Sequence, residues 1–156
     1  MIGRLHVIID SREGRDGLAM VSAALQAGAP GGPGTASRAR IDRMLYEFAC
    51  RVVELCARHA ATCIINDRVD IALAAGAAGT HLGADDLPVE AVRRVAGSGH
   101  LIGGTARDYR RAAELVAAGA DYMGSGRPTR RQRSPACPRR WVRLVSAPWR
   151  ARRGCR

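Results

Sequence analysis

Four polar residues in this sequence could together bind a metal ion and a phosphate group. Asn66, Asp67, Asp86 and Thr105 each follow closely after a short apolar run of strand length. Two carboxylates that reach one point are a usual way of holding Mg²⁺ beside a phosphate. Amide and hydroxyl groups can donate hydrogen bonds to phosphate oxygens or to a heterocycle. We therefore expect Asp67 and Asp86 as metal ligands, and Asn66 and Thr105 as substrate-binding residues.

Ordinary structural roles account for several of these polar residues as well. Asp85 or Asp86, just ahead of Pro88, is typical of a helix N-cap, and Asp70 suits a first helical turn. His81 at a strand end can be a hydrogen-bonded scaffold residue rather than a base. Residue types alone therefore indicate a phosphate-handling α/β protein and leave these alternatives open.

Short apolar runs alternate with amphipathic helical patterns along the chain, and these elements must position the polar residues. The clearest helix is 42–59, where Leu45, Phe48, Val52 and Cys56 recur at spacings of three and four. We expect strands at 5–9, 62–65, 79–82, 101–102 and 122–123, and helices at 17–27, 42–59, 69–75, 88–96 and 109–118. This alternation predicts an α/β fold with a parallel sheet, in which polar residues at strand ends converge. Units about 20 residues apart favour an incomplete TIM (β/α)8 barrel of about five to six of the eight βα units.

Charge divides the sequence into two unequal parts. All 25 basic residues are Arg, 14 residues are acidic, and the net charge is +11 over 156 residues. Residues 1–124 contain 14 Arg and 14 acids, whereas residues 125–156 contain 11 Arg and no acid. We expect a partial barrel over 1–124, disrupted at 30–40, and a basic tail over 125–156 that is disordered or read out of frame.

The same composition bounds the partners and the location. No apolar run approaches the roughly 20 residues of a membrane span, and the opening residues lack a signal-peptide layout. We expect a cytoplasmic protein with no membrane partner. The Arg-rich tail with Trp141 and Trp149 could contact nucleic-acid phosphates and stack on bases. It carries no binding-module signature, so small-molecule substrates rather than nucleic acids are the expected partners.

Four motifs follow one another at a specific spacing: NDRVDIA at 66–72, HLGADDLP at 81–88, IGGT at 102–105 and AAGADYMG at 117–124. Together they resemble the thiamine-phosphate synthase family. The resemblance implies an Mg²⁺-dependent transferase with a (β/α)8 barrel, which joins hydroxymethylpyrimidine diphosphate to a thiazole phosphate and releases pyrophosphate. By motif it implies Asp67 and Asp86 as Mg²⁺ ligands and Asn66 as a contact of the pyrimidine diphosphate. Thr105 stands where the family usually has Ser.

Two stretches depart from the family pattern. A Gln-x-Arg-x-Lys segment is replaced by residues 31–38, and a Thr-x-Thr-Lys loop by residues 125–131; the chain contains no Lys. Suitable codons for both stretches, re-read one base displaced, can encode Gln-Val-Arg and Thr-Thr-Thr-Lys, so we expect frame shifts at both places. The alternatives are a non-catalytic remnant that binds Mg²⁺ and diphosphate, or a basic-tailed nucleic-acid-binding protein. A thiazole tautomerase is disfavoured, because an isomerase does not require two carboxylates placed for a metal-bound diphosphate.

Overall fold

A computed structural model of the chain describes residues 7–10, 16–27, 34–36 and 42–125. Strands and helices alternate along these residues. In chain order they are β1 (Ile8–Asp10), α1 (Gly17–Gln26), β2 (Gly34–Ala36), α2 (Asp42–Arg58), β3 (Ile64–Asn66), α3 (Val69–Ala74), β4 (Gly79–Leu82), α4 (Val89–Ala96), β5 (Leu101–Ala106), α5 (Tyr109–Ala117) and β6 (Tyr122–Ser125).

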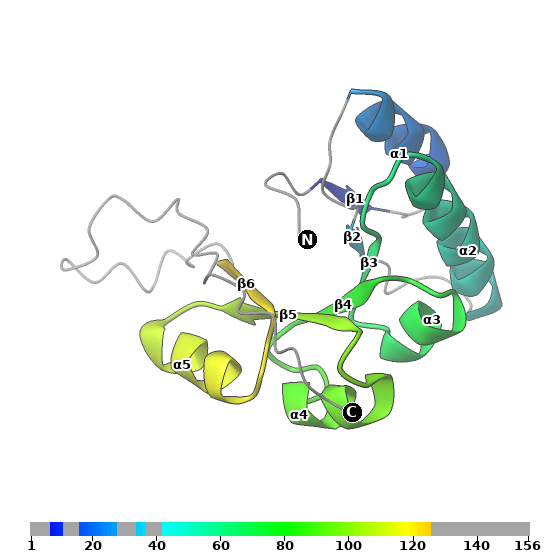
Figure 1. Cartoon of the computed structure of the whole chain (residues 1–156). Coiled ribbons are helices and arrows are strands. Elements are labelled where there is room, and N and C mark those ends of the chain that lie inside the picture. Colours follow the sequence, from blue (N-terminus) through cyan, green and yellow to red (C-terminus); the bar gives the residue numbers. More distant parts are fainter. Residues whose placement is uncertain (1–6, 11–15, 28–33, 37–41, 126–156) are drawn as a thin grey trace.

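The six strands form one parallel sheet in the order of the chain, β1-β2-β3-β4-β5-β6. Figure 1 shows the strands as a curved row with the helices along its outer, convex side. Each strand is thus joined to the next by a connection over the same face, as in the repeating units of a β/α barrel. Because all strands run the same way, their carboxyl ends lie at one edge of the sheet, which is where we look for a site.

Apolar stripes on the helices pack against the convex face of the sheet. The predicted stripe of α2 is buried, with Leu45, Phe48, Val52 and Cys56 at 2%, 7%, 0% and 1% exposure. It belongs to a core that also includes Ile9 and Ile65. A second core joins β4 and β5 to α4 and α5; its buried members are Val69, Leu82, Val89, Val92, Ile102 and Leu115. The 3.6-residue period of the sequence therefore places these helices correctly.

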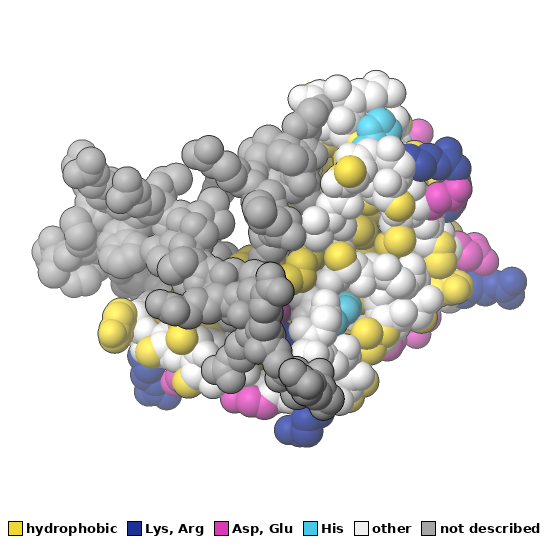
Figure 2. Space-filling model, viewed as in Figure 1, with side chains coloured by type: hydrophobic (Ala, Val, Ile, Leu, Met, Phe, Trp, Pro, Cys, Tyr) yellow, Lys and Arg dark blue, Asp and Glu magenta, His cyan; other side chains and the backbone are white. Residues whose placement is uncertain are grey.

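Charged side chains remain at the rim of the molecule. In Figure 2 the Arg, Asp and Glu side chains lie around the outer, helical edge, and hydrophobic side chains show along the inner arc. Arg43 pairs with Glu47 on α2 and Arg110 pairs with Glu114 on α5, each pair exposed and one helical turn apart. Such solvated pairs contribute little to stability. None of the helices in the described part of the chain is long and apolar enough to cross a membrane.

Two strands differ from the sequence expectations. Gly34–Ala36 pairs with both β1 and β3 inside the stretch expected to be disrupted, and backbone pairing needs no apolar side-chain pattern. β5 runs on to Ala106 instead of ending at residue 102. Gly103 and Gly104 interrupt the apolar pattern there, yet they fit the strand because neighbouring side chains occupy the space of a Cβ. The expectation for the tail concerns residues outside those described, apart from Ser125 at the end of β6.

Candidate functional site

One row of residues crosses the sheet near the carboxyl ends of its strands. Asn66 on β3 pairs in register with His81 on β4, His81 with Gly103 on β5, and Gly103 with Tyr122 on β6. Residues in register on parallel strands present their side chains to the same face. The opposite face carries the buried residues that pack on the helices, so this row lies on the concave side of the sheet, and Thr105 lies two residues beyond Gly103 on that side.

Asp67 follows directly after β3 and has a backbone conformation that few residues adopt. Its φ is 63°, in the left-handed region, and its N–H donates to the carbonyl of His81 at 2.9 Å. The N–H of Arg68 then donates back to the Asn66 carbonyl at 2.7 Å. A non-glycine residue held in this region costs about 1 kcal/mol or more, and such conformations cluster at functional sites. The turn presents Asp67 directly at the end of the strand.

Asp86 stabilises the loop that follows β4. Its Oδ2 accepts a hydrogen bond from the Gly83 N–H at 2.6 Å. The alternative that Asp85 or Asp86 caps the next helix is wrong, because α4 begins at Val89 with Pro88 as its N-cap and no side-chain cap bond. Asp86 therefore holds the loop that follows β4, and Asp67 follows the adjacent strand, β3.

Asp70 has the structural role left open by the sequence. Arg68 donates to both carboxylate oxygens of Asp70, at 2.9 and 2.6 Å, and also to Asp42 at 2.6 Å. The Arg68 guanidinium thereby holds the pKa of the Asp70 carboxyl below its ordinary value. This group of three charges connects α2 to α3 and leaves Asp70 out of the candidate site.

Thr105 is tied to His81 and Tyr122 across three strands. Nε2 of His81 lies 2.9 Å from the Thr105 hydroxyl, and its Nδ1 lies 3.2 Å from the Tyr122 hydroxyl. All three residues are half-buried. Burial, followed by the charge of Asp121, raises the pKa of the Tyr122 phenol above its ordinary value, so the phenol keeps its proton. The sequence interpretation missed Tyr122, although Gly103, the glycine that makes room for its ring, is part of a quoted motif.

An open pocket of about 690 Å³ begins at Thr105 and continues along the first turn of α5. Its charged lining residues are three arginines, Arg107, Arg110 and Arg111, and two carboxylates, Asp108 and Glu114. Arg107 forms no hydrogen bond or ion pair with any other described residue. Nε of Arg111 is buried without a hydrogen-bond partner, while another nitrogen of this guanidinium contacts Glu114 at 3.4 Å. The pocket thus combines a hydroxyl with cationic groups that are incompletely paired, which suits an anion.

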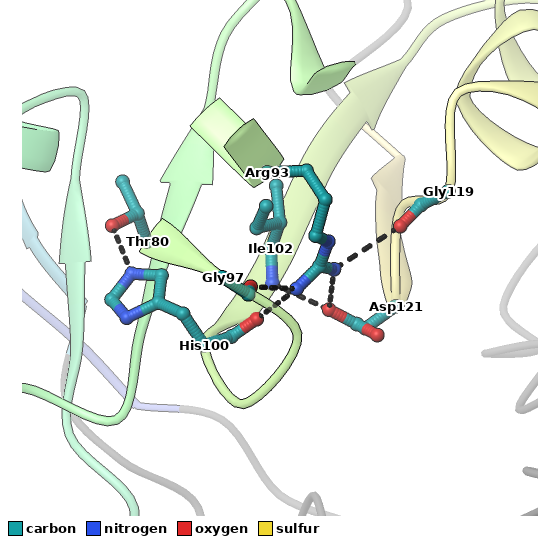
Figure 3. Close-up of polar contacts among 7 residues, drawn as sticks. All are labelled: Thr80, Arg93, Gly97, His100, Ile102, Gly119 and Asp121. Carbon is teal, nitrogen blue, oxygen red and sulfur yellow. Dashed lines mark hydrogen bonds and ion pairs between the residues drawn. The ribbon is translucent and has the colours of Figure 1, made fainter. Parts of the chain in front are cut away.

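A different polar network closes the opposite end of β5 and β6 (Figure 3). Arg93 donates to the carbonyls of Gly97, His100 and Gly119 and pairs with Asp121 at 2.6 Å. Asp121 also accepts from the Ile102 N–H at 2.7 Å. These contacts join the end of α4 to the starts of both strands. Because the network is at the amino ends of the strands, we assign it to stability and not to the site.

The candidate metal ligands are two carboxylates at neighbouring strand ends. Within residues 7–10, 16–27, 34–36 and 42–125, no three His, Cys, Asp or Glu side chains form a cluster that could hold a metal ion. Mg²⁺ is commonly held by one or two protein carboxylates, with water and substrate phosphates completing the coordination. Asp67 and Asp86 fit that pattern, so Mg²⁺ binding stays a prediction that the residues present can satisfy.

A parallel sheet built in chain order, with its helices on the convex face and polar groups at its carboxyl ends, defines a scaffold of the β/α-barrel type. Residues 5–145 match the sequence profile of the thiamine monophosphate synthase family, and the chain belongs to this family. This match crosses position 124, so the division of the chain there stays a prediction.

Individual relatives agree with the family match. The thiamine-phosphate synthase of Salinispora tropica is 51% identical over 130 residues, covering 80% of this chain and 61% of that protein. The thiamine-phosphate synthase of Salinispora arenicola is 50% identical over 136 residues, with the same coverage. Among solved structures, a thiamine phosphate pyrophosphorylase from Pyrococcus furiosus superposes with a TM-score of 0.73 at 30% identity, over 78% of this chain and 59% of that one. The chain therefore spans about three-fifths of the length of these relatives.

Proposed function

We propose that this protein joins hydroxymethylpyrimidine diphosphate to a thiazole phosphate, releasing pyrophosphate and forming thiamine phosphate. The observation that carries the proposal is the placement of Asn66, Asp67, Asp86 and Thr105 at or just beyond the carboxyl ends of three consecutive strands. Membership of the thiamine monophosphate synthase family supports the same reaction.

The reaction exchanges one bond to the pyrimidine methylene carbon for another. The bond from this carbon to the diphosphate oxygen breaks, and its electrons leave with the diphosphate. The lone pair of the thiazole nitrogen then forms the new C–N bond, so no oxidant or reductant takes part. Negative charge grows on the leaving diphosphate in the transition state, and groups placed beforehand to stabilise that charge supply the main catalytic effect.

The residues at the strand ends stabilise the diphosphate charge in two ways, through a metal ion and through direct hydrogen bonds. Asp67 and Asp86 would hold Mg²⁺, which when bound neutralises charge on the diphosphate. The amide of Asn66 and the hydroxyl of Thr105 donate hydrogen bonds to diphosphate oxygens. Arg107, which has no partner among the described residues and lines the pocket beside Thr105, supplies a positive charge in a chain without Lys.

The test is turnover by the purified full chain. Both substrates and Mg²⁺ are added, and release of pyrophosphate is followed by phosphorus NMR while thiamine phosphate is measured by chromatography. We expect stoichiometric formation of both products, and a loss of about 10²–10³ in rate for Asp67→Asn and Asp86→Asn. Asp85→Asn, a neighbouring exposed carboxylate, is the matched control and should stay within about threefold of the unmodified chain, as expected for a solvated side chain outside the site. No product from a folded chain, or equal losses in all three variants, contradicts the proposal.

A second candidate function is binding of Mg²⁺ and diphosphate without turnover. It is favoured by the two stretches of the sequence that depart from the family pattern, residues 31–38 and 125–131, and contain no Lys. Calorimetry with Mg²⁺ and inorganic pyrophosphate separates the two. Binding that is lost in Asp67→Asn, in a chain that forms no thiamine phosphate, supports the second candidate.

A further inference from the structure

A hydrogen-bonded chain runs across the concave face from β6 through β4 to β5. It consists of the Tyr122 hydroxyl, the two ring nitrogens of His81 and the Thr105 hydroxyl, with separations of 3.2 and 2.9 Å. The rings of His81 and Tyr122 are 5.5 Å apart between centroids and inclined by 35°. The sequence leaves two roles for His81, a scaffold or a base, and this geometry gives it a more specific one.

Two glycines leave the space that this arrangement occupies. A Cβ added to Gly103 would lie 2.1 Å from Cζ of Tyr122, a separation that side chains cannot adopt. A Cβ added to Gly124 would lie 3.2 Å from Cε1 of His81, tighter than an ordinary contact. The phenol ring therefore lies directly over the backbone of β5, which brings its hydroxyl to His81.

The order of protons along the chain decides what Thr105 can offer a ligand. A neutral imidazole has one N–H donor and one acceptor nitrogen. The Tyr122 end of the chain is a phenol and the Thr105 end is an aliphatic hydroxyl, and a phenol is by its chemistry the stronger hydrogen-bond donor. When Tyr122 donates to Nδ1, the proton of His81 is on Nε2 and is donated to the oxygen of Thr105. The hydroxyl hydrogen of Thr105 is then free to point toward a ligand.

We propose that His81 and Tyr122 are positioning residues that hold the Thr105 hydroxyl as a hydrogen-bond donor to a phosphate oxygen of the substrate. This inference rests on the proposed function and specifies how one of its contacts is made. The ligand chemistry follows from the surroundings, because three arginines against two carboxylates line the same pocket, and Arg107 forms no ion pair with any described residue. The reverse proton order would leave Thr105 presenting only lone pairs to the pocket, which repel a phosphate oxygen.

The proton order is measured directly by nitrogen NMR of ¹⁵N-histidine-labelled protein. Long-range ¹⁵N–¹H correlations distinguish a protonated from an unprotonated ring nitrogen, and His81→Gln assigns the signals. We expect His81 as the Nε2–H tautomer in the full chain, and a mixture of tautomers in Tyr122→Phe. A stable Nδ1–H tautomer overturns the proposal.

The consequence for binding is measured by calorimetry with Mg²⁺ and inorganic pyrophosphate. We expect Thr105→Val to weaken binding about tenfold, the size expected for one hydrogen bond to a charged group, and Tyr122→Phe to weaken it about twofold to threefold, because only the molecules with the Nε2–H tautomer then keep the Thr105 hydrogen available. The double variant should bind no more weakly than Thr105→Val alone, because that change has already removed the donor. Thr105→Ser should retain binding, and Tyr46→Phe, at a 39% exposed tyrosine on α2 that does not line this pocket, is the matched control.

Different results would contradict the proposed function and the positioning role of His81 and Tyr122. If the unmodified chain binds no pyrophosphate and forms no product, the proposed function fails and the phosphate role of Thr105 fails with it. If the unmodified chain binds pyrophosphate but Tyr122→Phe binds it equally well, only the positioning role is overturned. Additive losses in the double variant overturn it too.

Discussion

Replacing Arg93 by Met should destabilise the fold more than the same replacement at any other arginine that forms an ion pair in the described part of the chain. Met keeps an unbranched apolar stem and removes the charged head, so packing changes little. The side chains of Arg93 and Asp121 are 25% and 23% exposed, and their contact is 2.6 Å long. The Arg93 head also holds the half-buried carbonyl of His100 at 2.5 Å, whereas its contacts to Gly97 and Gly119 are solvent-exposed.

The magnitude follows from which of these bonds water can replace. A hydrogen bond between charged groups is worth about 1.5–3 kcal/mol, and one to a neutral carbonyl about 1 kcal/mol. Water can replace Arg93 at the two exposed carbonyls, so these add little. We expect a loss of about 3 kcal/mol in the free energy of unfolding. At roughly 2–4 °C per kcal/mol for a chain of this size, the melting temperature falls by about 10 °C.

Urea unfolding followed by circular dichroism is the measurement, with Arg110→Met as the matched control. Arg110 also forms an ion pair, with Glu114, but its side chain is 89% exposed. Its loss should cost no more than about 0.5 kcal/mol. If the two variants differ by less than about 1 kcal/mol at equal denaturant slope, the argument that burial makes the Arg93 network strong is refuted.

Three further predictions concern stability. The pKa of His100 is lowered in the folded protein, mainly because the ring is buried and secondly because Arg93 is positively charged. Below about pH 6.5 the unfolded chain therefore binds more protons than the folded protein does. The stability that neutral His100 contributes should therefore be complete above that pH and decline as the pH falls toward the pKa of His100 in the folded protein. The urea midpoints at pH 7.5 and pH 5.5 should differ less in His100→Gln than in the unmodified chain. Gly79→Ala places a Cβ 2.4 Å from the Leu101 carbonyl oxygen and should cost about 2–3 kcal/mol, whereas Gly99→Ala, with nothing within 4 Å, should be neutral in the same melts. Asp67→Asn should leave the free energy of unfolding unchanged, whereas Asp67→Val should lower it by about 1–2 kcal/mol. The reason is that Asn tolerates the left-handed backbone at φ 63° and a β-branched residue does not. Equal melting temperatures of the two variants would contradict this.

Local periodicity predicted most of the fold. α2 and α5 are found close to their expected bounds, because their apolar spacing is set by a single buried face. Strand ends were harder: β5 continues through Gly103 and Gly104, where an apolar pattern stops but the backbone pairing does not. β2 has no apolar signature at all, and only its pairing with both neighbours defines it.

The polar residues at strand ends could be predicted because chain order alone brings parallel carboxyl ends to one edge. Asn66, Asp67, Asp86 and Thr105 all lie there. Tyr122 could not be predicted as a partner of His81, since that contact depends on the register of β4, β5 and β6 across 41 positions. The Arg93 network was equally hidden, because three of its acceptors are backbone carbonyls that any sequence provides.

The order of the sheet has a consequence for how the protein is made. Paired residues on neighbouring strands are as close as 15 positions, for Ile64 and Gly79, and as far as 30 positions, for Gly34 and Ile64. Each strand therefore finds its partner already synthesised a short distance back along the nascent chain, and loop closure over such distances costs little entropy. The sheet can grow one strand at a time during translation, always by addition at the same edge. Until the next strand arrives, that edge offers unpaired backbone groups to any other extended segment nearby.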